Sequence, residues 1–175
     1  MNFHQSIQLI SSSSSAKRKL TTNGREVQPK AERLEESKPK PGMPKHNELR
    51  DMIKWIGNAR GLVSETEYRI NGYRLDCAWR KPVRQTPDQV WEVHIGGDFF
   101  EALAKLKHAW DLWGSEPFLV TTDVAARQAE KLLGGTFHEM KHDIRILKWQ
   151  DIVKLYNLLR QAAELEKDMR LLDVS

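Results

Sequence analysis

The sequence predicts an α/β sandwich with a mixed central sheet, and three features indicate it. The Asn71-Gly72 dipeptide joins two runs of β-branched and aromatic residues, which is typical of an antiparallel hairpin. Downstream, short apolar strands alternate with amphipathic helical patterns, which is typical of parallel strands joined by helices. The chain has 175 residues, of which 39% are hydrophobic, enough for one core. We expect the order helix, three strands, helix, strand, helix, strand, helix.

Residues 1–44 are expected to form a disordered arm. They contain the run Ser11–Ser15 and the basic cluster Lys17–Lys19, with almost no aromatic residues. Such a segment buries too little apolar surface to offset the entropy lost on ordering. It is either a basic arm that contacts phosphates or a solvated tail.

The main domain is expected over residues 45–148. Apolar residues at helical spacing predict a first helix that begins at His46 or Asn47 and ends at Gly57 or Gly61. The alternation of apolar and polar residues then predicts three strands, at Ser64–Ile70, Tyr73–Trp79 and Gln89–Ile95.

The second half of this domain alternates helices and strands. Asp98, after the Gly96-Gly97 break, is a candidate N-cap for a helix that runs to Trp113. The remaining elements are a strand at 117–122, a helix at Asp123–Leu133, a strand at Ile144–Leu147, and a C-terminal helix within residues 149–175.

Two acidic residues, Asp76 and Glu92, lie on strands that are otherwise apolar. A carboxylate in such surroundings carries a large desolvation penalty unless it is paired or binds a metal. Side chains alternate faces along a strand, so Glu92 and His94 point to the same side. If Asp76 faces that side too, two carboxylates and an imidazole converge in a candidate catalytic site.

This pattern resembles the PD-(D/E)xK nuclease superfamily, above all its restriction-endonuclease-like and archaeal Holliday-junction-resolvase-like branches. The resemblance extends over about residues 45–147 and implies a restriction-endonuclease-like fold. It implies that Glu48, Asp76 and Glu92 bind Mg²⁺ or Mn²⁺. His94 occupies the position of the motif lysine and departs from it, and Leu75 stands where the family often has proline.

The resemblance implies a Mg²⁺-dependent DNA endonuclease that hydrolyses phosphodiesters, with DNA as the expected partner and RNA left open. Neutral histidine at position 94 is a weaker electrostatic stabiliser than lysine, although it can serve as a base or a ligand. Lys81, Lys105 and Lys107 are alternative sources of charge, but the last two lie well along a helix and are expected to be too distant. The alternative is a catalytically inactive nucleic-acid-binding or assembly protein with the same fold; a plain interaction module is a third reading.

Composition sets further limits. The net charge of +4 and the pI near 9.2 are compatible with nucleic-acid binding. No apolar run approaches the roughly 20 residues that span a bilayer, so no membrane partner is expected. The single cysteine, Cys77, is expected to be a small core residue in a reducing compartment, which favours the cytoplasm. The long apolar stripe of the C-terminal helix predicts a homodimer.

Overall fold

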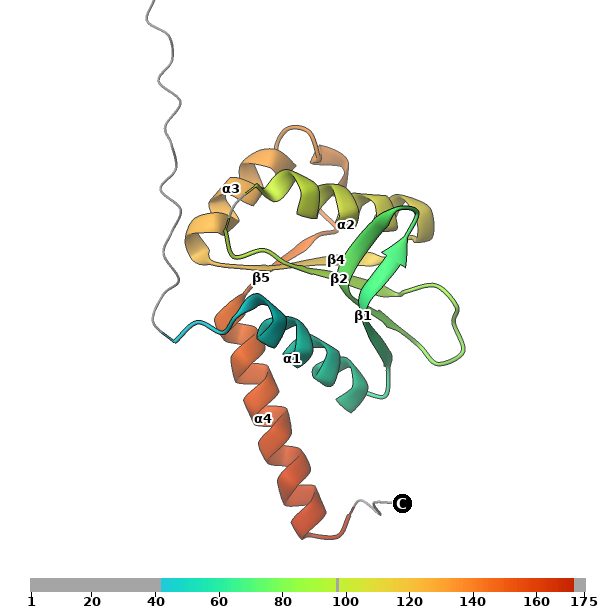
Figure 1. The fold of residues 1–175 in the computed structure, drawn as a ribbon, viewed down its shortest axis with the longest axis vertical. Coiled ribbons are helices and arrows are strands. Elements are labelled where there is room, and N and C mark those ends of the chain that lie inside the picture. The colour runs from blue at the N-terminus through green and yellow to red at the C-terminus, as the bar shows by residue number, and fades with distance from the viewer. Residues whose placement is uncertain (1–41, 97, 172–175) are drawn as a thin grey trace, which may run out of the picture. The chain divides into compact units, whose positions relative to one another are not determined.

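The structure, a computed structural model, describes residues 42–96 and 98–171. The predicted N-terminal arm therefore lies outside the described residues, apart from its last three positions. A five-stranded sheet in the order β1-β2-β3-β4-β5 carries helices on both faces (Figure 1). The predicted α/β class and mixed central sheet are confirmed.

The sheet consists of an antiparallel half and a parallel half. β1 pairs with β2 and β2 with β3 in antiparallel fashion, whereas β3, β4 and β5 are parallel. Asn71 and Gly72 connect β1 and β2 with φ angles of 41° and 89°, the left-handed conformations that a tight hairpin turn requires. The strands are β1 Val63–Ile70, β2 Tyr73–Arg80, β3 Gln89–Val93, β4 Glu116–Thr121 and β5 Arg145–Lys148.

Side-chain caps fix where two of the helices begin. Asp98 accepts a hydrogen bond from the Phe100 amide (2.9 Å), as its candidate role as N-cap predicts, and Thr122 accepts one from the Ala125 amide (3.3 Å). The helices are α1 His46–Ala59, α2 Phe99–Trp113, α3 Asp123–Leu133 and α4 Trp149–Asp168, with a short 3₁₀ helix η1 at His138–Met140. All of the predicted elements are present, with boundaries shifted by a few residues.

Two hydrophobic layers flank the sheet. One packs α2 and α3 against it around Phe99, and the other packs α1 and α4 against it around Trp91 (Figure 1). In the second layer α1 comes very close to the sheet: a Cβ on Gly57 would lie 2.6 Å from Trp79 Nε1. All six tryptophans pack in these layers.

Cys77 is fully buried, and burial raises the pKa of its thiol to about 11, so it behaves as the predicted core residue. Among the described helices, none is long and apolar enough to cross a membrane.

Candidate active site

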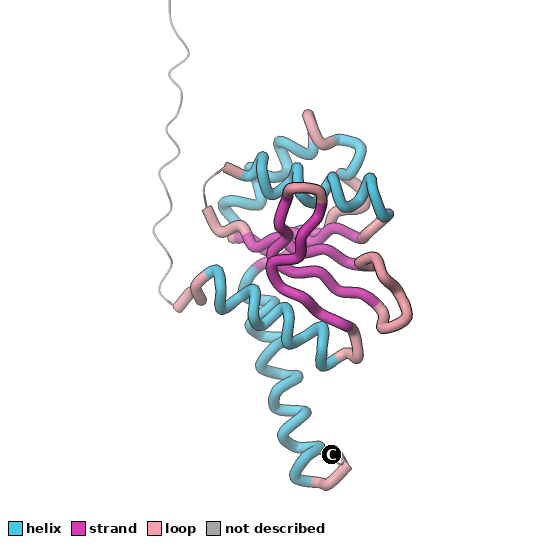
Figure 2. The backbone as a smooth tube through the Cα atoms, turned by 45° about the vertical axis from the view of Figure 1, so that its right-hand side comes forward, coloured by secondary structure: helices cyan, strands magenta, loops and turns pink. Residues whose placement is uncertain are grey.

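The hairpin of β1 and β2 passes from one layer of the molecule to the other (Figure 2). In β2, Cys77 packs in the layer of α1 and α4, but Leu75 packs in the layer of α2 and α3. Residues two apart on a regular strand share a face, so β2 must rotate at Asp76. β1 rotates at the same level, because Ser64 contacts Cys77 while Ile70 packs with Leu75. The rotation point of the hairpin is therefore at Asp76.

On β1 the position that faces Asp76 belongs to Glu67. The ladder pairs Thr66 with Cys77 and Tyr68 with Leu75, which places Glu67 and Asp76 opposite each other between these pairs. Glu67 has a φ of 55°, a left-handed conformation that is unusual for a residue of this kind inside a strand. The rotation of the hairpin is thus concentrated at two acidic residues.

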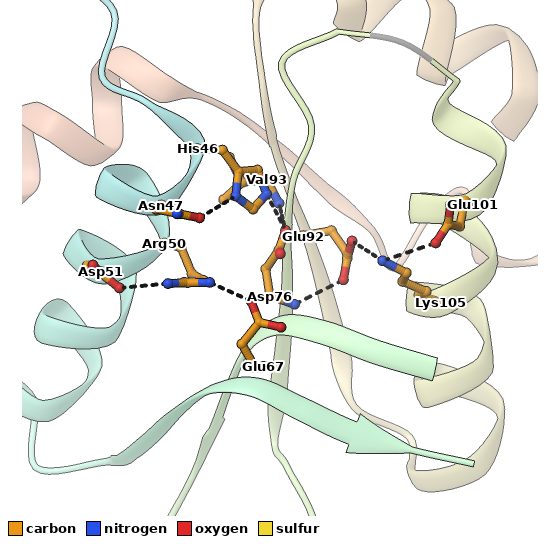
Figure 3. Close-up of polar contacts among 10 residues, drawn as sticks. All are labelled: His46, Asn47, Arg50, Asp51, Glu67, Asp76, Glu92, Val93, Glu101 and Lys105. Atoms are coloured by element: carbon orange, nitrogen blue, oxygen red, sulfur yellow. Dashed lines mark hydrogen bonds and ion pairs between the residues drawn. The ribbon is translucent and has the colours of Figure 1, made fainter. Parts of the chain in front are cut away.

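On the other side of β2, the two carboxylates replace the backbone ladder. β2 and β3 pair from Trp79↔Gln89 to Cys77↔Trp91, and the next opposing residues are Asp76 and Glu92. There the Asp76 amide donates to Glu92 Oε1 (3.1 Å), and the Val93 amide donates to Asp76 Oδ2 (2.8 Å; Figure 3). The structure therefore brings the two predicted carboxylates together, each bonded to the strand of the other.

Glu92 is only 3% exposed, and its charge is balanced from α2. Lys105 Nζ lies 3.3 Å from Glu92 Oε2 and 3.5 Å from Glu101 Oε1 (Figure 3). Burial, with a contribution from the charge of Asp76, raises the pKa of Glu92 to about 8. Burial, the largest single influence, lowers the pKa of Lys105, but the carboxylates around it, Glu92 first, together outweigh burial and raise that pKa. The expectation that Lys105 is too far along its helix is therefore wrong.

α1 contributes a histidine to the site, and not the predicted Glu48. His46 Nε2 lies 3.1 Å from Asp76 Oδ2, and this hydrogen bond raises the pKa of the imidazole. The carboxylate of Glu48 turns back and accepts a hydrogen bond from the Lys45 amide (2.8 Å), which caps the helix. The reason is helical geometry: residues 46 and 50 share the face toward the sheet, whereas 48 lies roughly 200° around the axis from 46.

His94 follows directly after the end of β3. Its ring packs edge-on against Phe99, with centroids 4.2 Å apart, so it lies in the layer of α2 and α3. Glu92 reaches Lys105 of α2 in that same layer. The expectation that Glu92 and His94 share a side of the sheet is confirmed.

Beside this site is a polar hollow of about 390 Å³. It is lined by Glu67, Gly72, Tyr73, Arg74, Asp76, Glu101 and Lys105. Two arginines hold Glu67 at its edge: Arg50 of α1 forms an ion pair with Oε1, and Arg74 Nη1 lies 3.1 Å from Oε2. The hollow and these guanidinium groups were not anticipated from the sequence.

The ligands available for a metal ion are the two carboxylates. Within residues 42–96 and 98–171, no group of three His, Cys, Asp or Glu side chains is placed to hold a metal. Mg²⁺, however, commonly takes only one or two protein carboxylates and keeps several waters. Burial is the main cause of the raised pKa of Glu92, with the charge of Asp76 next, and a divalent cation bound here would offset both. Asp76 and Glu92 are therefore the two neighbouring carboxylates that could hold a Mg²⁺ ion here, and Glu48 is directed elsewhere.

No protein-family model, no curated protein and no solved structure matches this chain. The assignment of function therefore depends on the geometry of the site itself.

Proposed function

We propose that this protein is a Mg²⁺-dependent DNA endonuclease of the PD-(D/E)xK type, with a restriction-endonuclease-like fold. The observation that carries the proposal is the group formed by Asp76, Glu92 and Lys105, where β2 and β3 stop sharing backbone hydrogen bonds. The Asp76 and Glu92 carboxylates each bond to the other's strand, and the Lys105 ammonium group contacts Glu92. Metal-assisted phosphodiester hydrolysis uses residues of these types.

Each side chain has a distinct task in this proposal. Asp76 and Glu92 would bind Mg²⁺, or Mn²⁺ in its place. When bound, the ion would polarise the scissile phosphate and lower the pKa of a bound water. Lys105 places a positive charge beside Glu92 and stabilises negative charge that develops on the phosphate. The role of the motif lysine thus falls to a residue of α2.

Two histidines are placed to handle protons. His46 contacts Asp76 Oδ2 directly and is positioned to hold a proton at that oxygen. His94, at the position of the motif lysine, is proposed to accept a proton from the attacking water, a role that imidazole side chains serve in enzymes.

One observation favours the alternative, a catalytically inactive nucleic-acid-binding or assembly protein with the same fold. Asp76 and Glu92 satisfy the two backbone amides left without ladder partners where β2 and β3 separate. A purely structural role would account for those two bonds. It gives no reason for Lys105 and His46 to converge on the same two side chains.

The experiment that decides between them uses purified protein and end-labelled linear and branched DNAs and RNAs. We expect cleavage of DNA with Mg²⁺ or Mn²⁺ and none with EDTA. Failure to cleave any of these substrates with either metal, in a preparation that still binds them, would establish the inactive alternative.

We also propose that the protein acts in the cytoplasm as a homodimer formed through α4. This helix exposes Leu158 and Leu165 to 55% and 60%, and the thiol of Cys77 suits a reducing compartment. Light scattering at micromolar concentration should give twice the mass of one chain, and a Leu158→Glu, Leu165→Glu variant should give the mass of one chain. A monomeric wild-type protein would overturn the dimer.

A further inference from the structure

Glu67 combines a left-handed backbone conformation with ion pairs to two arginines. A left-handed conformation is strained for a residue other than glycine, asparagine or aspartate, and it persists only when the surroundings impose it. Glu67 adopts this conformation within β1, and its carboxylate is placed between Arg50 and Arg74. Strain of this kind is concentrated at binding and catalytic sites.

The two guanidinium groups come from different elements and meet at one anion. Arg50 projects from α1 with its side chain only 17% exposed, and Arg74 projects from β2 beside the hollow. Figure 3 shows Arg50 directed at Glu67 and the Asp76 site next to them. A carboxylate presents two oxygens that share one negative charge, and a phosphodiester presents the same through its two non-bridging oxygens. Arginine binds both in the same forked geometry.

The charge around the hollow opposes a polyanion as long as Glu67 is present. Its lining contains three carboxylates, Glu67, Asp76 and Glu101, against the cations Arg74 and Lys105. Release of Glu67 would remove a carboxylate from the anion position and leave Arg74 and Arg50 without this partner, although Arg50 Nη2 also lies 3.4 Å from Asp51 Oδ1.

We propose that Arg50 and Arg74 form a phosphate subsite for the nucleic-acid backbone next to the cleavage site, and that Glu67 occupies this subsite in the ligand-free protein. The inference deepens the proposed function and rests on it for the class of ligand. An incoming phosphodiester displaces the Glu67 carboxylate and takes over its two arginine contacts. Glu67 therefore lowers the affinity for nucleic acid and excludes ligands that bind the arginines too weakly to compete.

The test measures binding without cleavage, by fluorescence anisotropy of a labelled single strand and a labelled duplex in EDTA with the full-length chain. Glu67→Gln keeps the size of the side chain and removes its charge. We expect it to lower Kd about threefold to fivefold, the equivalent of one partly exposed charge pair. The matched control is Glu65→Gln on the same strand, whose carboxylate lies 3.2 Å from Arg80 Nη2 and is similarly exposed (47% against 43% for Glu67). It should change Kd less than twofold.

A double-mutant cycle separates displacement from a general change of charge. Arg74→Gln should weaken binding at least about threefold more in the Glu67→Gln background than in the wild type, because only there is Arg74 fully available to phosphate. Equal gains in Glu67→Gln and Glu65→Gln, additive effects in the cycle, or no binding by any variant would each overturn the subsite. Since no metal is present, binding that follows the expected pattern would support the subsite even if the protein proved unable to cleave DNA.

Discussion

The two edges of β3 differ, although both belong to one five-residue strand. Along β4 the pairing is continuous from Gln89↔Glu116 to Val93↔Val120. Along β2 it stops at Cys77↔Trp91, and side chains form the next two hydrogen bonds. Buried backbone amides need a partner wherever strands separate, and a carboxylate can supply one. At such a position an acidic residue can stabilise the fold and remain available for chemistry.

The largest expected effect tests whether the β2 side of β3, called the open edge because its ladder stops at Cys77↔Trp91, is catalytic. Asp76→Asn and Glu92→Gln each keep size but lose the charge that would bind Mg²⁺, so the cleavage rate should fall below about one hundredth of the wild-type rate. Glu116→Gln, on β4 opposite Gln89 of β3, should retain the wild-type rate. Rates are measured on labelled DNA with Mg²⁺, and folding is checked by circular dichroism. Near-normal cleavage by either site variant would exclude that residue from the site.

Lysine substitutions sharpen the comparison, because they test which lysine supplies the positive charge that catalysis at the open edge requires. Lys105→Ala removes the partner of Glu92 and should reduce kcat about a hundredfold. Lys107→Ala is the control, because Lys107 lies on the same helix but pairs with Asp111 (2.8 Å) and Glu139 (2.7 Å). Similar losses in both variants would indicate a general effect on α2 or on DNA binding.

His94 directly follows the end of β3, so a substitution there tests whether the catalytic site extends beyond the strand. If it accepts a proton from water, His94→Ala should lose about tenfold to a hundredfold in kcat. In the wild type kcat should fall as pH drops below the ordinary imidazole range, and His94→Ala should lack that dependence. A variant with the full wild-type rate would leave Lys105 as the sole replacement for the motif lysine.

The last effect concerns the stability of the protein in the absence of metal and DNA, and not its rate of cleavage. The pKa of Glu92 is about 8 when folded, against about 4.3 when unfolded, so the folded state binds more protons between these values. The free energy of unfolding should therefore decrease, on the order of a few kcal/mol, as pH rises from 5 to 8. Urea unfolding should show this decrease in the wild type and a much smaller one in Glu92→Gln. The raised pKa of His46 also makes stability decrease as pH rises, and the difference between His46→Gln and the wild type measures its contribution. An equal pH dependence in Glu92→Gln would contradict the assignment to Glu92.

The sequence predicted the fold well because most elements carry a local signal. The Asn71-Gly72 turn, the Asp98 cap and the alternation in β3 each depend on neighbouring residues, and all agree with the structure. Asp76 and Glu92 were identified for the same reason, as charges between apolar residues on strands.

The other site residues could not be predicted, since they depend on contacts between distant segments. Lys105 reaches Glu92 only because α2 packs back over the sheet. His46, Arg50 and Glu67 depend on the rotation of the hairpin. That rotation leaves no trace in the pattern, because alternate residues from Ser64 to Ile70 and from Leu75 to Trp79 remain buried or half-buried while the layer that they contact changes. Glu48 was predicted from the family pattern, and the helix face toward the sheet carries His46 in its place.

The close approach at Gly57 has a consequence for how this protein can diverge. Gly57 lies about three turns of helix from His46, and the missing Cβ is what lets α1 rest on Trp79 and Ser64. A single methyl group at position 57 would push α1 away from the sheet, and His46 and Arg50 would move with it. Positions 57 and 79 should therefore covary: where a relative gains a side chain at the first, we expect the indole at the second to be replaced by a smaller group.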